Sequence, residues 1–261
     1  MFVVALAELG GPAEAEVPVL AADLGCTAYD ARLMLAGGLP AVVKTTADKA
    51  QAIELLGKLR ARGHGAVACD TGAVASSGSM KTMKAFRLGA DAIEEGGERL
   101  PYDDLVALVG AVHRSRTDST TVSKEKKFSM SRALLTSGLS MSKTVTKETK
   151  ASAEDRESVL YLFRKSGEAP WLLREHGTNW AGHGRALEAT EAGNFKVTVA
   201  LLREKAKGAQ YDDRLVTRKV GERAALHGGS GTTTVKTSSE ATMDLLAHVL
   251  AMWLARAGAY R

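Results

Sequence analysis

The stretch Phe2-Val-Val-Ala-Leu-Ala-Glu-Leu9 decides how the N-terminal part of the chain folds. It is followed by Gly10-Gly11-Pro12, and an apolar run that ends at a turn of this kind is typical of a strand. Further along, Thr27 is followed three residues later by Asp30, the pattern of a helix-capping box. The region is predicted to form a strand at 2–9, helices at 15–24 and 28–36, a strand at 41–45, a helix whose apolar face carries Ala52, Leu55, Leu56 and Leu59, and a strand at 66–69.

This order of elements resembles the C-terminal domain of the bacterial ribosomal stalk protein and the related N-degron adaptor of the Clp protease. The resemblance covers residues 2–70 and rests also on Leu39-Pro-Ala-Val-Val-Lys-Thr-Thr46 and on Gly63 at the end of the third helix. It implies a βααβαβ fold. The segment Glu14–Asp23 lacks the basic residues of the stalk domain's first helix, and Gly10-Gly11-Pro12 replaces the adaptor's acidic loop. Neither family's binding activity is therefore expected here.

Residues 71–83 are small and polar, and they are predicted to be a linker. The chain beyond them is predicted to have a strand from Phe86, a turn at 95–97, a strand or short buried helix at 105–113, strands at 128–131, 139–142, 158–164 and 170–175, and a helix at 186–207.

Several strands followed by one long helix resemble a bacterial pleckstrin-homology-like domain. The resemblance covers residues 84–207 and is carried by Phe86-Arg-Leu-Gly-Ala-Asp-Ala-Ile93, Leu100-Pro-Tyr-Asp-Asp-Leu105 and the closing segment Asn194–Arg203. It implies an antiparallel sheet closed by a helix. The polar stretch 114–127 departs from this pattern and is predicted to be a loop or a strand extension.

After residue 210, the segment 223–234 contains Gly-Gly-Ser-Gly and is predicted to be a mobile loop. A terminal helix follows, with one apolar stripe formed by Leu246, Val249, Leu250 and Trp253. This stripe is expected to dock on the helix's own domain, or alternatively to mediate self-association or contact a partner. The predicted fold class is α+β, with domains at 1–70 and 84–210, a linker at 71–83, and a loop and helix at 211–261.

Composition excludes several classes of protein. The 261 residues are 45% hydrophobic and 25% charged, which is typical of a globular chain. Cys26 and Cys69 form no CxxC pair, so no zinc ribbon or disulfide framework is expected. The apolar run Leu245–Ala255 is interrupted by His248 and is shorter than the roughly 20 residues that span a bilayer. With no basic residue before the apolar N-terminus, a signal peptide is not expected, and the predicted location is cytoplasmic.

The net charge of +5 is concentrated in residues 114–150, which hold 9 basic and 3 acidic side chains. Lys and Arg can neutralise phosphate oxygens, so this segment is a candidate site for anionic lipid headgroups; the alternative is a solvated face of a sheet. Aromatic residues among the basic ones are limited to Phe128, so nucleic acid is not an expected partner. The anion-binding candidates are Arg114, Arg116, Lys124, Lys126, Lys127, Arg132, Lys143, Lys147 and Lys150.

Two weaker patterns concern metal chemistry. Asp103 and Asp104 precede Glu125-Lys126-Lys127, as in nucleases that hold Mg²⁺ with carboxylates. His176 and His183 are the closest pair of histidines, and a metal site between them is a minor alternative. Neither pattern is specific, so no catalytic residue, metal or cofactor is expected. The preferred hypothesis is a non-catalytic cytoplasmic binding or scaffolding protein that contacts a partner protein or a second copy; lipid binding and a metal-dependent nuclease are the alternatives.

Overall fold

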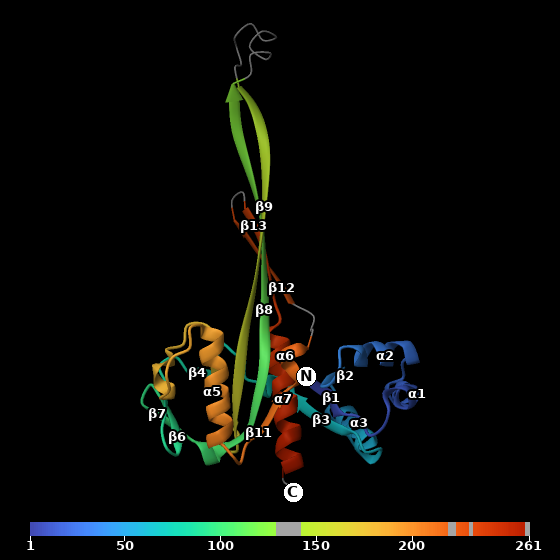
Figure 1. Ribbon diagram of the computed structural model, residues 1–261. Coiled ribbons are helices and arrows are strands. Elements are labelled where there is room, and N and C mark those ends of the chain that lie inside the picture. Colours follow the sequence, from blue (N-terminus) through green and yellow to red (C-terminus); the bar gives the residue numbers. More distant parts are fainter. Residues whose placement is uncertain (129–141, 219–222, 230–231, 259–261) are drawn as a thin grey trace. The chain divides into compact units, whose positions relative to one another are not determined.

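In the computed structural model, the N-terminal apolar stretch is the central strand of a three-stranded sheet (Figure 1). Strand β1 (Phe2–Glu8) lies between β2 (Ala41–Thr46) and β3 (Gly65–Asp70) and is antiparallel to both. The structure describes residues 1–128, 142–218, 223–229 and 232–258, with side chains described at 1–119, 151–218, 235 and 237–257.

The chain divides into two units. The first unit comprises residues 1–113, 157–221 and 240–261, and the second unit comprises 114–156 and 222–239. Helices and strands both contribute substantially, so the predicted α+β class is confirmed. The domain boundaries predicted after residues 70, 83 and 210 all fall inside the first unit.

Around β1, the elements follow the predicted βααβαβ order. They are β1, α1 (Ala13–Leu24), α2 (Ala28–Ala36), β2, α3 (Lys49–Ala61) and β3. The capping box at α2 is confirmed, because Thr27 Oγ1 accepts the Asp30 N–H at 3.1 Å and Asp30 Oδ2 accepts the Thr27 N–H at 3.2 Å. At α3 the cap is Asp48 itself, whose Oδ1 accepts the Ala50 N–H at 2.7 Å.

Both faces of the three-stranded sheet are covered within the first unit. Val4 and Leu6 belong to a core cluster with residues of α1 and α3. Val3 and Ala5 point to the other face and pack with Val249 of α7 (Glu240–Gly258). Successive strand residues face opposite sides, so a strand buried on both sides is apolar at every position. This explains the uninterrupted apolar run of β1.

Beyond β3 the chain forms further strands and helices, of which β8 and β9 run from the first unit into the second. They are η1 (Thr71–Ala73), β4 (Lys81–Thr82), β5 (Arg87–Leu88), β6 (Ala92–Glu95), β7 (Glu98–Pro101), η2 (Tyr102–Asp104), β8 (Leu105–Phe128), β9 (Ser142–Arg164), β10 (Trp171–Arg174), η3 (Trp180–His183), α5 (Glu191–Lys205), β11 (Gln210–Asp213) and α6 (Arg214–Thr217). Strands β5, β6 and β7 form an antiparallel sheet, and β10 pairs antiparallel with β9.

Two pairings differ from the predicted antiparallel sheet. Strand β4 is parallel to β10, and β11 is parallel to β8. Both strands reach their neighbours through long connections rather than tight hairpins, and parallel pairing requires such connections. The segment 71–83, predicted to be a linker, carries η1 and β4 and buries Ser77, Met80 and Met83.

In the second unit, β12 (Arg223–Gly229) pairs antiparallel with β13 (Thr232–Ser238), which pairs antiparallel with β8. The prediction of a mobile loop at 223–234 is therefore wrong for the described part of that segment. The Gly-rich sequence suggested a loop, whereas the Thr-rich residues after it favour a strand. The polar stretch 114–127 is a strand extension, since β8 continues to Phe128. The strands predicted at 128–131 and 139–142 lie almost wholly outside the described residues.

Candidate binding site

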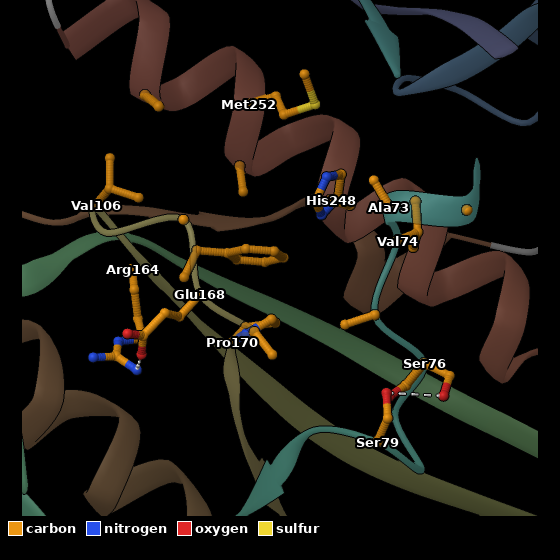
Figure 2. Close-up of a pocket in the computed structure, with 17 residues that line it drawn as sticks. Ala73, Val74, Ser76, Ser79, Val106, Arg164, Glu168, Pro170, His248 and Met252 are labelled. Atoms are coloured by element: carbon orange, nitrogen blue, oxygen red, sulfur yellow. Dashed lines mark hydrogen bonds and ion pairs between the residues drawn. The ribbon is translucent and has the colours of Figure 1, made fainter. Parts of the chain in front are cut away.

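A cavity of about 530 Å³ lies in the first unit (Figure 2). Its wall is formed by α7, by the residues of and after η1, and by the turn that joins β9 to β10. Among the side chains that line it are Val106, Phe163, Pro170, His248 and Met252. Apolar groups form the larger part of this lining, beside the polar side chains of Ser76, Ser79, Arg164 and Glu168.

Local sequence builds each wall. On α7, His248, Ala251, Met252 and Ala255 lie at i, i+3, i+4 and i+7, so all four share one helix face. Two of these four are alanines, which leaves room beside the helix. On the opposite wall, Gly167 has φ +77°, a conformation that lets the chain reverse between the two strands.

His248 is the one imidazole among the described side chains of the cavity wall. Its ring packs edge-on to Phe163, with 6.0 Å between ring centroids and 64° between ring planes. Burial lowers the pKa of His248, which favours the neutral imidazole. The ring is half-buried and its nitrogens are not among the buried polar atoms that lack a partner, so solvent reaches them.

The charges at the rim of the cavity are paired. Arg164 Nε donates to Asp104 Oδ2 at 2.9 Å, and Arg164 also forms an ion pair with Glu168. Asp104 Oδ1 accepts the Ser166 N–H at 3.2 Å. The rim therefore holds no uncompensated charge at these positions.

A second feature of the first unit is a buried polar cluster. Tyr161 is fully buried, and its hydroxyl donates to Asp244 Oδ1 at 2.7 Å. His113 Nε2 lies 2.7 Å from the same hydroxyl. Ser77 donates both its hydroxyl and, at 2.8 Å, its N–H to Asp244. Burial, followed by the charge of Asp244, raises the pKa of Tyr161 well above its usual value.

The cluster continues through charged residues. His113 Nδ1 lies 3.4 Å from Glu240 Oε1. Arg174 Nη2 lies 3.2 Å from the same oxygen and 2.6 Å from Glu157 Oε2. The hydrogen bond to Glu157 raises the pKa of Arg174, and the contact with His113, then that with Arg174, lowers the pKa of Glu240 to about 2.

Only two of the nine anion-binding candidates have described side chains. Arg116 is exposed and lies 3.0 Å from Asp118, while Arg114 is half-buried. The backbone places Lys124, Lys126 and Lys127 on β8 and Lys143, Lys147 and Lys150 on β9, and Arg132 lies outside the described residues. Lipid-headgroup binding by this segment therefore stays a prediction.

The self-association candidates on α7 lie in the core of the chain itself. Leu246, Val249 and Leu250 are at most 2% exposed, and Trp253 is half-buried. The side chains pack against β-strands and helices of the first unit, so the stripe is not a free surface. The apolar periodicity reflects docking of the helix on its own unit.

Three of the residues considered for metal chemistry, Asp104, His176 and His183, have structural partners. Asp104 pairs with Arg164, and the side chain of Glu125 lies outside the described residues. His176 Nδ1 lies 2.9 Å from Glu191 Oε2, and His183 Nδ1 accepts the Arg185 N–H at 3.0 Å. In the part of the chain that is described, no three His, Cys, Asp or Glu side chains are placed to hold a metal ion, and no helix is long and apolar enough to cross a membrane.

The sequence analysis named none of the cavity residues as a site. The one available signal was His248, which interrupts an apolar run without a polar neighbour to explain it. The cavity itself arises where three separate segments meet, and sequence spacing does not reveal that meeting. Comparison with family models, with curated proteins and with solved structures finds no match to the chain.

Proposed function

We propose that the chain is a non-catalytic binding protein that acts through protein–protein contacts, and that the cavity of the first unit receives an apolar segment of a partner protein. The observation that carries this proposal is the cavity of about 530 Å³ with its largely apolar lining. Pockets that bind ligands commonly have volumes of about 300–1,000 Å³ and walls of this kind. Cys26 and Cys69 are free thiols, which supports the proposed cytoplasmic location.

The rim supports an occupant that enters from solution. Met252 is 39% exposed although its side chain is large and apolar, and Ala255 beside it is exposed as well. A methionine at a binding surface adapts its shape to the group that it contacts. Because Arg164 and Glu168 neutralise one another, the rim favours an uncharged segment over an acidic or a basic one.

The experiment compares two substitutions on the same helix. Ala255→Phe places a ring in the mouth of the cavity at an exposed position, while Ala241→Phe makes the same change at an exposed α7 position that does not line the cavity. The full chain and both variants are used to select from a phage-displayed library of random 12-residue peptides. Thermal unfolding checks that both variants are folded.

We expect peptides with an apolar consensus that bind the wild type and the Ala241→Phe variant but bind the Ala255→Phe variant at least tenfold more weakly. The absence of a consensus on the wild type would contradict the proposal. Equal binding to the Ala255→Phe variant would also contradict it, because the peptides would then dock elsewhere.

A further inference from the structure

We propose that the cavity is specific for a tyrosine side chain of the partner, whose phenol hydroxyl hydrogen-bonds to His248. This inference rests on the proposed function and names the group that the cavity recognises. It is carried by the position of one half-buried imidazole in the cavity wall, whose nitrogens are reached by solvent and whose ring packs on Phe163.

The walls suit an aromatic ring. Phe163 offers a ring already packed edge-on to His248, and aromatic rings favour edge-to-face or offset contacts with one another. Met252 adds a thioether, a group that makes favourable contacts with aromatic rings, and Pro170 adds an apolar surface. An aliphatic side chain would fill space here without using these ring contacts.

The imidazole suits a hydroxyl. A neutral imidazole has one nitrogen that donates and one that accepts a hydrogen bond, and the two can exchange roles. A phenol hydroxyl both donates and accepts, so it fits whichever nitrogen faces the cavity. Tryptophan only donates, and phenylalanine does neither, so a bound phenylalanine would leave His248 without a partner.

The charge balance excludes ionic occupants. Arg164 already contacts Asp104 and Glu168, so it offers no free charge for a carboxylate or a phosphate. A lysine or arginine side chain would lose hydration in the apolar cavity without gaining an opposite charge. Tyrosine is uncharged at neutral pH, and its ring end carries the single polar atom that His248 can satisfy.

The test uses two pairs of probes that differ by one hydroxyl. They are p-cresol against toluene, and N-acetyl-tyrosinamide against N-acetyl-phenylalaninamide. Binding to the full chain is measured by ligand-observed NMR titration. We expect the hydroxylated member of each pair to bind about fivefold more tightly, the ratio that a net hydrogen bond of about 1 kcal/mol produces.

Two variants separate the inference from the proposed function. His248→Phe keeps a ring beside Phe163 but removes the nitrogens, so the preference for the hydroxyl should vanish or reverse. Ala255→Phe should abolish binding of all four probes, and Ala241→Phe should leave binding unchanged.

Equal affinities for p-cresol and toluene in the wild type would overturn the inference and leave the proposed function standing; this comparison needs no variant. Binding of p-cresol without binding of N-acetyl-tyrosinamide would overturn the assignment to a protein side chain. If no probe binds the wild type, or if Ala255→Phe has no effect, the proposed function itself is wrong.

Discussion

Removing the hydroxyl of Tyr161 should lower the free energy of unfolding, because this buried hydroxyl makes two hydrogen bonds. Tyr161→Phe keeps the ring in a fully buried site but removes the atom that joins His113 to Asp244. Two hydrogen bonds of 2.7 Å are lost, each with a net contribution of about 1 kcal/mol. His113 Nε2 is left buried without this partner, which adds about 1 kcal/mol or more.

Asp244 keeps both donors of Ser77, so its share of the cost is smaller. The expected loss is therefore about 2–4 kcal/mol. Urea unfolding followed by circular dichroism measures it, and with an m-value of about 3 kcal/mol/M the midpoint should fall by about 1 M.

The matched control is Tyr29→Phe on α2, where the side chain is 69% exposed. That change should alter the free energy of unfolding by less than about 0.5 kcal/mol. A loss at Tyr161 no larger than the loss at Tyr29 would refute the reasoning, since it would mean that the cluster contributes nothing beyond the burial of its rings.

Two further predictions concern the first unit. The contact with His113 lowers the pKa of Glu240 from its usual 4.5 to about 2, so the stabilisation from this carboxylate is complete above pH 4.5 and is lost as the pH falls towards 2. Glu240→Gln should flatten that part of the pH dependence in thermal unfolding; an unchanged acid limb would contradict it. Gly65→Ala would place a Cβ 2.6 Å from Trp253 Nε1 and should cost about 1–3 kcal/mol, whereas Gly57→Ala in α3, with open space around its Cβ, should stabilise by about 0.5–1 kcal/mol. Urea unfolding of both variants should give opposite shifts, and shifts of the same sign would show that the packing at Gly65 is misjudged.

Local patterns predicted the N-terminal elements well because each depends on neighbours in sequence. The apolar run of β1, the cap of α2 by Thr27 and Asp30, and the apolar face of α3 all reflect interactions within a few residues. The strands predicted at 158–164 and 170–175 followed from the same kind of signal.

Predictions failed where a segment's surroundings come from distant parts of the chain. The segment after Arg223 forms strands because β12 pairs with β13, and β13 pairs in turn with β8, whose residues lie more than a hundred positions earlier in the chain. Residues 71–83 are small and polar, which suggested an exposed linker. Ser77 is nevertheless buried, because Asp244 accepts hydrogen bonds from its N–H and its hydroxyl. Neither partner is visible in the local sequence.

The sequence by itself determined the class of the fold, the order of elements around β1, and the presence of a terminal helix with an apolar stripe. Only the tertiary structure decided that this stripe is buried against the rest of the first unit. It alone also decided that His248, on a neighbouring face of the same helix, lines a cavity together with Phe163. Hydrophobic periodicity records that a helix face is covered; it does not record what covers it or where the packing leaves a space.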